Sequence, residues 1–362
     1  MRERGPRVAL LAIGLFTPAT AKTAIGVLRY ARYPVVAVID PDRAGTDASM
    51  HVGAGAGIPV VATVADAIGL GADAILVGTA AAGGRIPDAY RPALATALEH
   101  GLEVWSGLHE RVLADPGLRA AAERGGGRVR ELREPPADLP IGGHRRPRSG
   151  TATVLTVGSD AAVGKMTVSL EIVAALDRGG ERAAFVPTGQ TGIAIAGEGI
   201  SVDAVVADFV AGAAERMVCD ASERADWVVV EGQGSLTHPG FSGVTLGLLH
   251  GSAPDLMVLC HDASRRTVKG YGELPLRPLV ELVRLYEEAA RWSRHPDAPR
   301  ARVVAVALNT SALDGRDAAR AIFDASATTG LPAGDPIREG AAGADRIAHS
   351  LREARAERMA AR

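Results

Sequence analysis

A glycine-rich segment with one lysine has the residue types and spacing of a phosphate-binding loop: Gly158-Ser-Asp-Ala-Ala-Val-Gly-Lys-Met-Thr167. Glycines let successive backbone N–H groups turn inward around an anion, and Lys165 would reach the outer phosphates. The usual pattern has Ser or Thr directly after the lysine, whereas here Met166 stands between Lys165 and Thr167. The segment is therefore a variant, and its alternative interpretation is an ordinary glycine-rich turn.

The sequence on both sides of this segment supports phosphate binding. Val154–Val157 is a short apolar run that suits a buried parallel strand, and the apolar residues between Val168 and Leu176 recur at helical spacing. A helix that begins at the loop would add the partial positive charge of its N-terminus. Thr167 and Asp160 would hold Mg²⁺ only if the ligand is ATP. We expect the cofactor to contact Gly158, Ser159, Asp160, Val163, Gly164, Lys165, Met166 and Thr167.

A carboxylate follows the next strongly apolar strand. Residues 228–230 are valines, and Glu231 and the turn Gly232-Gln-Gly-Ser235 come directly after them. In P-loop folds an acid at this place lies beside the phosphates and orients a metal ion or water. Glu231 is therefore a candidate general base or metal-shell residue, and the alternative is that it caps the following turn. Within that turn, Gln233 and Ser235 are candidate substrate contacts.

Two histidines and three cations are further candidates for chemistry. Imidazole titrates near neutral pH, so His238 and His261 are candidate acid–base groups, although each could instead be a hydrogen-bonded structural residue. Arg265, Arg266 and Lys269 form a cationic group that suits recognition of a substrate carboxylate or phosphate. No HExxH-type spacing occurs, so we expect no zinc site.

Two polar residues near the ends of predicted strands are additional candidates for cofactor binding. Gln190 lies in the turn that follows the predicted strand Ala183–Pro187, and Asn309 follows the predicted strand Val303–Leu308. The carboxyl ends of parallel strands meet at one edge of a sheet, where such sheets bind ligands. We therefore expect Gln190 and Asn309 to contribute to the cofactor site.

The first third of the chain has the pattern of a parallel sheet. Residues 7–133 alternate β-branched runs with helical segments, which predicts strands with helices on both faces. The first turn, residues 14–23, has a single glycine, so we do not expect a nicotinamide dinucleotide, although Asp40 stands where a ribose-binding acid would lie. Lys22 and Thr23 at a helix start could hold an anion or could simply begin a capped helix.

A stretch rich in Pro, Gly and Arg interrupts this pattern and reads as a connector. We therefore predict an N-terminal domain over residues 1–140, a linker over residues 141–150 and a C-terminal domain over residues 151–362. Both domains are expected to be α/β with parallel sheets.

Composition excludes several classes of partner. The net charge is −2, from 40 basic and 42 acidic residues, so we expect neither a nucleic-acid nor a membrane partner. No apolar run is long enough to cross a bilayer, and the first residues read as a strand rather than a leader, so we expect a cytoplasmic protein. Cys219 and Cys260 lie in apolar stretches, which predicts two buried thiols.

Together these segments resemble the D-glutamate N-acetyltransferase family, whose members join an N-terminal Rossmann-like domain to a C-terminal P-loop NTPase-like domain. The resemblance covers nearly the whole chain. The loop alone also resembles that of dethiobiotin synthetase, from which it departs at Met166. The motifs that carry the family resemblance include Ser106-Gly-Leu-His109, Gly158–Thr167, Thr188-Gly-Gln-Thr-Gly-Ile193, Glu231-Gly-Gln-Gly-Ser-Leu236 and Gly243–Gly251.

The family resemblance implies transfer of an acetyl group from acetyl-CoA to the amine of a small acidic amino acid, D-glutamate. The residues are compatible with this reaction, because the loop could bind the phosphates of coenzyme A and N–H groups near residues 232–235 could stabilise the oxyanion. The resemblance to dethiobiotin synthetase implies instead an ATP- and Mg²⁺-dependent ligase or kinase acting on a small carboxylate. A nucleotide-binding regulatory protein is the third alternative. The Ala- and Gly-rich helices lead us to expect a homo-oligomer.

Overall fold

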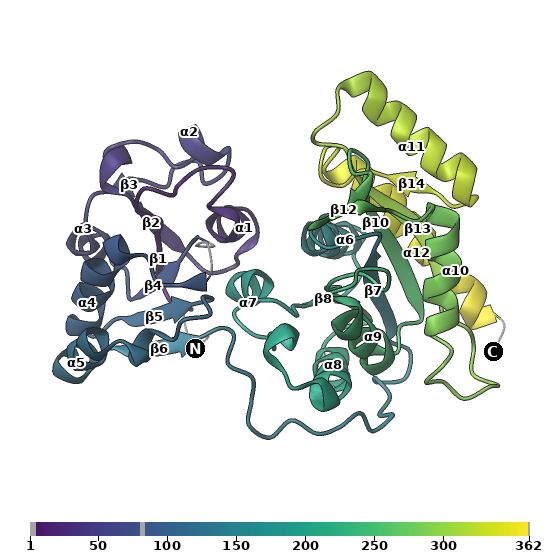
Figure 1. The fold of residues 1–362 in the computed structure, drawn as a ribbon, viewed down its shortest axis with the longest axis horizontal. Helices are drawn as coiled ribbons and strands as arrows, with labels where there is room; N and C mark the ends of the chain where they lie inside the picture. Colours follow the sequence, from purple (N-terminus) through teal and green to yellow (C-terminus); the bar gives the residue numbers. More distant parts are fainter. Residues whose placement is uncertain (1–4, 80–83, 361–362) are drawn as a thin grey trace. The chain divides into compact units, whose positions relative to one another are not determined.

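The computed structural model describes residues 5–79 and 84–360. Within these residues the chain forms two compact units, each built on a sheet of 6 parallel strands (Figure 1). The first unit contains the chain up to Glu134 together with Gln190–Ser201, and the second contains Pro135–Gly189 and the chain from Val202 onward. The α/β class with two parallel sheets, expected from the sequence, is thus confirmed.

The sheet of the first unit has the strand order β3-β2-β1-β4-β5-β6, and each pairing is parallel. The strand order reverses between β1 and β4, which is the point where open α/β sheets bind ligands. Strands β1 and β4 are buried along their whole length because helices cover both faces of the sheet. The strands are β1 (Val8–Leu11), β2 (Val35–Ile39), β3 (Val60–Val61), β4 (Ala74–Val77), β5 (Glu103–Ser106) and β6 (Arg128–Glu131). The helices are α1 (Lys22–Tyr30), α2 (Ser49–Val52), α3 (Val64–Gly69), α4 (Arg91–Glu99), α5 (Pro116–Gly125) and α7 (Gln190–Ala196).

Helix α7 belongs to the first unit although it follows β8 of the second unit in sequence. The Tyr33 hydroxyl donates to the Ala194 carbonyl over 2.6 Å, and Arg130 donates to the Gly197 carbonyl over 2.6 Å. The side chains of Thr23 and Thr191 are hydrogen-bonded at 2.9 Å. Residues 190–201, which the sequence placed in the C-terminal domain, therefore complete the N-terminal one.

The sheet of the second unit has the order β14-β13-β10-β7-β9-β8, with parallel pairing throughout. Strand β7 is central and is buried from end to end. A short antiparallel pair, β11 with β12, lies outside this sheet. The strands are β7 (Ala152–Gly158), β8 (Ala183–Val186), β9 (Trp227–Val230), β10 (Leu256–Asp262), β11 (Thr267–Val268), β12 (Tyr271–Pro275), β13 (Arg302–Asn309) and β14 (Ala333–Gly334). The helices are α6 (Lys165–Arg178), α8 (Ala207–Ser222), α9 (Ser242–Ser252), α10 (Leu279–Ala289), α11 (Gly315–Thr329) and α12 (Ala341–Ala360).

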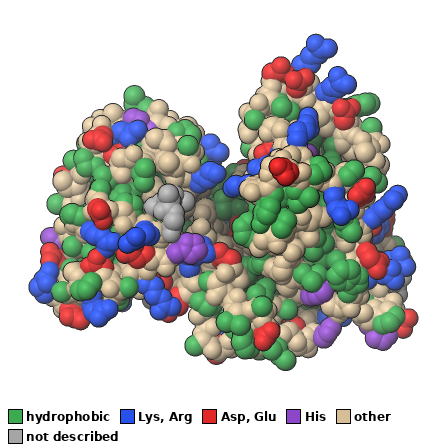
Figure 2. Space-filling view, viewed as in Figure 1, with side chains coloured by type: hydrophobic (Ala, Val, Ile, Leu, Met, Phe, Trp, Pro, Cys, Tyr) green, Lys and Arg blue, Asp and Glu red, His purple; other side chains and the backbone are tan. Residues whose placement is uncertain are grey.

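The core of the second unit joins helices from distant parts of the sequence. Val168 and Ile172 of α6 pack with Ile347 and Leu351 of α12 against the sheet. Both cysteines are buried free thiols, as expected. None of the helices in the described parts of the chain combines the length and apolarity needed to cross a membrane. On the face seen in Figure 2, basic and acidic side chains alternate over both units.

The second unit departs from the sequence-based expectation at two places. The pattern predicts one helix over Val202–Met217, but the structure has a 3₁₀ turn at Val202–Ala204 and then α8. The predicted linker is docked, because the Gly143 N–H donates to Glu215 over 3.0 Å and Arg148 donates to Asp226 over 2.8 Å. The segment therefore packs as part of the second unit.

Candidate functional site

The glycine-rich loop joins the end of β7 to the start of α6. In the sheet, β7 lies between β9, which precedes Glu231, and β10, which contains His261. Gly164 has a φ of 106°, and Ala162 has a φ of 54°, in the left-handed region that non-glycine residues seldom occupy. Such strain persists where the surroundings impose it, and it is concentrated at ligand sites. Within the described residues, the N–H groups of residues 162–167 have no hydrogen-bond acceptor, so they can bind an anion.

A buried carboxylate holds the loop in this shape. Asp160 is fully buried, and one of its oxygens accepts the Ala161 N–H over 2.7 Å. The other accepts the Lys269 N–H over 2.8 Å and Arg265 Nη1 over 2.9 Å. Arg265 also donates to the Ala161 carbonyl. Asp160 and Arg265, predicted as cofactor and substrate contacts, therefore tie the loop to the segment after β10.

Lys165 connects the loop to the turn after Glu231. Its side chain is buried, and Nζ donates to the Asp160 carbonyl over 2.8 Å and to the Gly234 carbonyl over 2.7 Å. Burial lowers the pKa of this ammonium to about 8. A bound phosphate would therefore compete with two carbonyl oxygens for the same positive charge.

Glu231 lies directly after β9 and is buried. Burial raises the pKa of its carboxyl group to about 7, against the opposing effect of the backbone N–H groups of Thr188 and Gly189. The Thr188 N–H donates to Glu231 Oε2 over 3.0 Å, and Gln233 Nε2 donates to Thr188 Oγ1 over 3.1 Å. A Cβ at Gly232 would lie 1.7 Å from the Thr156 carbonyl oxygen, so only glycine fits there. The carboxyl group is thus held near its ionisation point at neutral pH, which suits a base.

Tyr286 of α10 was missed by sequence reasoning, because it belongs to no motif and lies far from the loop in sequence. Its hydroxyl donates to the Gly158 carbonyl over 2.7 Å and accepts the Leu236 N–H over 3.2 Å. Burial raises the pKa of this phenol, so it stays protonated at neutral pH. Ser235 is also buried and accepts the Thr237 N–H over 3.3 Å. These bonds fix the turn after Glu231 relative to the loop.

The two histidines differ in their bonding. His261 Nδ1 lies 2.8 Å from Ser159 Oγ, and burial lowers the pKa of this imidazole to about 4, so it is neutral at pH 7. His238 Nδ1 accepts the Gly240 N–H over 3.1 Å, which places its proton on Nε2, 3.2 Å from the Lys269 carbonyl oxygen. Both nitrogens of His238 are thus engaged by the backbone, and this residue orders the loop around Asp160.

The remaining predicted residues lie in different places. Arg266 is exposed, and its Nη1 lies 3.4 Å from the Ala263 carbonyl oxygen. Asn309 ends β13, where its Oδ1 accepts the Ser311 hydroxyl over 2.8 Å. Gln190 belongs to the first unit, where its Oε1 accepts Arg133 Nη1 over 2.9 Å. Among the loop residues, Val163 is buried, whereas Met166 and Thr167 are partly exposed in the first turn of α6.

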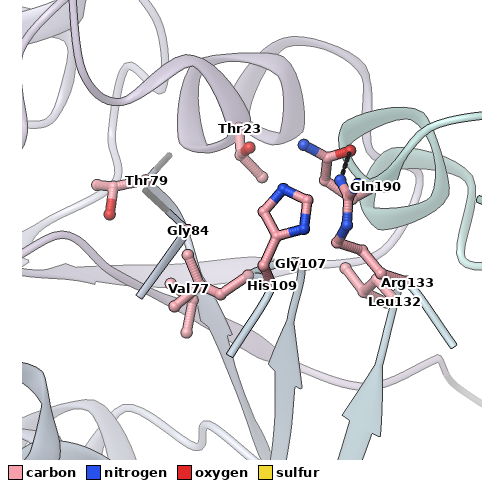
Figure 3. Close-up of a pocket in the computed structure, with 10 residues that line it drawn as sticks. Thr23, Val77, Thr79, Gly84, Gly107, His109, Leu132, Arg133 and Gln190 are labelled. Carbon is pink, nitrogen blue, oxygen red and sulfur yellow. Dashed lines mark hydrogen bonds between the residues drawn. The ribbon is translucent and has the colours of Figure 1, made fainter. Parts of the chain in front are cut away.

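A second candidate site is a pocket of about 360 Å³ in the first unit, at the carboxyl ends of β4, β5 and β6 and beside the start of α1. Figure 3 shows the His109 ring, the Arg133 guanidinium and the Gln190 amide close together on one side of this pocket. Thr23 and Thr79 add hydroxyl groups to its lining. The sequence analysis named Lys22 and Thr23 as residues that could hold an anion, and Thr23 lines this pocket.

Two glycines give this pocket its shape. Gly84 has a φ of 68°, and a Cβ there would lie 2.3 Å from the His109 ring. A Cβ at Gly107 would lie 2.9 Å from Gln190 Cβ and Cγ. The absence of a side chain at Gly107 therefore lets the start of α7 pack against the end of β5. Larger residues at either position would displace the groups that line the pocket.

A phosphate-binding loop on a central parallel strand, in a chain that also carries a Rossmann-like unit, defines a two-domain α/β protein of the P-loop class. The chain belongs to the DUF1611 family of domains of unknown function. The model of the family's Rossmann-like N-terminal domain matches residues 41–135, and that of its P-loop C-terminal domain matches residues 141–347.

Relatives of known name and structure agree with this assignment. The chain is 36% identical over 326 residues to a D-glutamate N-acetyltransferase of Tritonibacter scottomollicae, covering 89% of this chain and 92% of the relative. It is 36% identical to a D-glutamate N-acetyltransferase of a Pseudoalteromonas species, covering 77% of this chain and 82% of the relative. The crystal structure of a DUF1611 family protein from Anabaena variabilis superposes with a TM-score of 0.84 at 38% identity, covering 96% of this chain and 100% of that one.

Proposed function

We propose that this chain is an N-acetyltransferase that moves the acetyl group of acetyl-CoA to the amine of D-glutamate or a similar small acidic amino acid. The observation that carries the proposal is the 36% identity, over 89% of the chain, to a relative that bears this name. Burial raises the pKa of the Glu231 carboxyl group to about 7, and the N–H groups of residues 162–167 have no acceptor among the described residues. Both features are compatible with acetyl transfer.

The loop fits the phosphates of the donor. The N–H groups of residues 162–167 are available to bind a phosphate at the start of α6, and Lys165 supplies a positive charge beside them. When bound, acetyl-CoA supplies an activated acetyl group on a thioester. Binding of its phosphates by the loop requires no hydrolysis.

The amine must lose a proton before it can attack the thioester, and Glu231 is the residue we assign to accept it. With its pKa raised to about 7 by burial, the carboxylate is a better base than an exposed glutamate and still half ionised at neutral pH. The N–H of Gly232 donates to Thr156 Oγ1 over 3.0 Å and is thus engaged. Donors for the oxyanion therefore come from residues 233–235.

The main alternative, an ATP- and Mg²⁺-dependent ligase or kinase, makes a different demand on Asp160. A metal ligand must offer an oxygen to the ion, whereas both Asp160 oxygens already accept hydrogen bonds from the loop and from Arg265. This donor set favours the acetyltransferase over the ligase. The third alternative, a nucleotide-binding regulator, needs no general base, so it gives no role to the raised pKa of Glu231.

An assay with D-glutamate and acetyl-CoA separates these functions. We expect free coenzyme A and an acetylated amine to form without ATP, and the rate to survive EDTA. Release of ADP that depends on both D-glutamate and Mg²⁺ would replace this proposal with the ligase. Binding of ATP with no turnover of either donor would leave the regulator.

A further inference from the structure

We propose that a pocket of the second unit holds the pantetheine arm of coenzyme A, an inference that rests on the proposed function. The pocket has a volume of about 610 Å³ and lies between α9, the β11–β12 pair and α10. That volume is within the range of pockets that hold small organic ligands. We call it the α10 pocket, and its apolar lining includes Leu236, Leu246, Val268, Leu274, Leu285 and Trp292.

Two walls of the α10 pocket are joined to the glycine-rich loop by hydrogen bonds. Lys269 comes directly after Val268, and its N–H donates to Asp160 over 2.8 Å. Tyr286 comes directly after Leu285, and its hydroxyl donates to the carbonyl of the first loop residue over 2.7 Å. The pocket is therefore built on the same contacts that fix the shape of the loop.

A third wall leads to the turn after Glu231. Leu236 follows residues 233–235, to which we assign the oxyanion, and its N–H donates to the Tyr286 hydroxyl over 3.2 Å. The α10 pocket thus adjoins both the loop to which we assign the phosphates and the turn to which we assign the acetyl group. Because the pantetheine arm joins the pyrophosphate of coenzyme A to its thiol, a site for this arm must adjoin both.

The lining suits a ligand with methyl and methylene groups and a few amides. Leu274, Leu285 and Trp292 are exposed, so a ligand that packs against them removes apolar surface from water. Thr237 and Ser242 add hydroxyl groups, which can bond to either atom of an amide. The pantetheine arm has this composition, with two methyl groups on one carbon, several methylenes and two amides.

The charges of the lining are paired, which favours an uncharged ligand. In the described parts of the chain, the charged residues that line the α10 pocket are Arg277 and Glu288. Arg277 Nη1 lies 3.4 Å from Glu281 Oε2, and Glu288 Oε2 lies 3.1 Å from Arg291 Nη1. The pocket therefore presents no net charge to a phosphate or to the carboxylates of D-glutamate, whereas the pantetheine arm is uncharged.

Gly243 allows the pocket to be filled without strain. It lies in the first turn of α9 and lines the pocket, and a Cβ there would have no atom within 4 Å. Gly243→Leu should weaken binding of coenzyme A by about 10- to 100-fold, because the added side chain occupies the place of the arm. Binding of 3′-phosphoadenosine diphosphate, the half of coenzyme A without the arm, should stay unchanged. Calorimetry on the full-length chain measures both affinities.

Gly315→Leu is the matched control. Gly315 begins α11, a Cβ there also has no atom within 4 Å, and the residue lies outside the lining of the pocket. A second variant, Leu285→Ala, removes part of the apolar wall and should weaken coenzyme A by about 3- to 10-fold. Its control is Leu113→Ala, because Leu113 of the first unit is 39% exposed and Leu285 is 38% exposed. Thermal melting verifies that each variant folds.

The outcomes separate this inference from the proposed function. If folded Gly243→Leu and Leu285→Ala bind coenzyme A like the unmodified chain, the arm site is wrong, and acetylation of D-glutamate is untouched by that result. A changed molecular mass in sedimentation, with unchanged affinity for coenzyme A, would also overturn it and make the α10 pocket an interface between copies of the chain. Weakened coenzyme A binding in both variants, without acetylation by the unmodified chain, would keep the arm site and remove the acetyltransferase alone.

Discussion

The two units place polar groups at the same edge of the same kind of sheet, but they use them differently. In the second unit, Asp160, Lys165 and Arg265 are bonded to one another's backbone and side chains, so these contacts fix the shape of the loop. In the first unit, Arg133 and His109 line a pocket into which a molecule fits. The first arrangement is a rigid loop to which we assign the phosphates of the donor, and the second is an open space lined by polar side chains.

The largest effect expected in the second unit is on the chemical step. Glu231→Gln removes the proposed base while keeping the shape of the side chain, so kcat should fall by about 10²–10⁴-fold. Binding of acetyl-CoA, measured by calorimetry, should change little. Glu223→Gln, at an exposed acid, serves as the control. A kcat in Glu231→Gln within a factor of two of the original would assign the base to another residue.

Loss of Lys165 should weaken phosphate ligands by about 10- to 100-fold, because a charged donor is removed. Affinity for acetyl-CoA should also decline as pH rises through about 8, where the ammonium of Lys165 loses its proton. In Lys165→Ala this pH dependence should vanish. The Asp160 and Gly234 carbonyls lose their donor in this variant, so we also expect a cost of about 1–3 kcal/mol in unfolding free energy. Equal affinity for acetyl-CoA and ATP before and after the change would contradict the loop assignment.

A smaller effect is expected when the loop loses its internal carboxylate. Asp160→Asn keeps the size of the side chain but removes its ion pair with Arg265, which keeps only the longer contact to Asp262, so the unfolding free energy should fall by about 1–3 kcal/mol. Urea unfolding measures this change. Arg266→Ala, at an exposed neighbour, should stay within about 0.5 kcal/mol. Equal stability of the two variants would show that the loop is held by other contacts.

The smallest effect concerns how stability varies with pH. Burial raises the pKa of Glu231 from 4.5 to about 7, so this residue favours folding most at low pH and loses that contribution as pH rises through about 7. Glu231→Gln does not titrate. The unfolding free energy of the variant relative to the unmodified chain should therefore rise by about 2 kcal/mol between pH 5 and pH 8. Urea unfolding at the two pH values tests this, and a difference independent of pH would mean that Glu231 is not perturbed.

The sequence predicts those features that depend on neighbouring residues. The loop, the strand before Glu231 and the alternation of strands and helices are local patterns, and the two sheets were found from them. The bonds of Arg265 to Asp160 and of Tyr286 to Gly158 join residues 105 and 128 positions apart, and no local pattern reports them. The same holds for Gln190, whose place in a strand–turn motif suggested the phosphate site, whereas α7 packs with the first unit.

The membership of α7 in the first unit bears on how the protein is made. A ribosome that has released residues 1–134 has supplied all six strands of the first sheet but not the helix that bonds to Tyr33 and Thr23. The first unit can be completed only after residue 201 has emerged, when the first strands of the second sheet are already present. A gene truncated near residue 135 would therefore encode a first unit that lacks α7 and the contacts α7 makes with it.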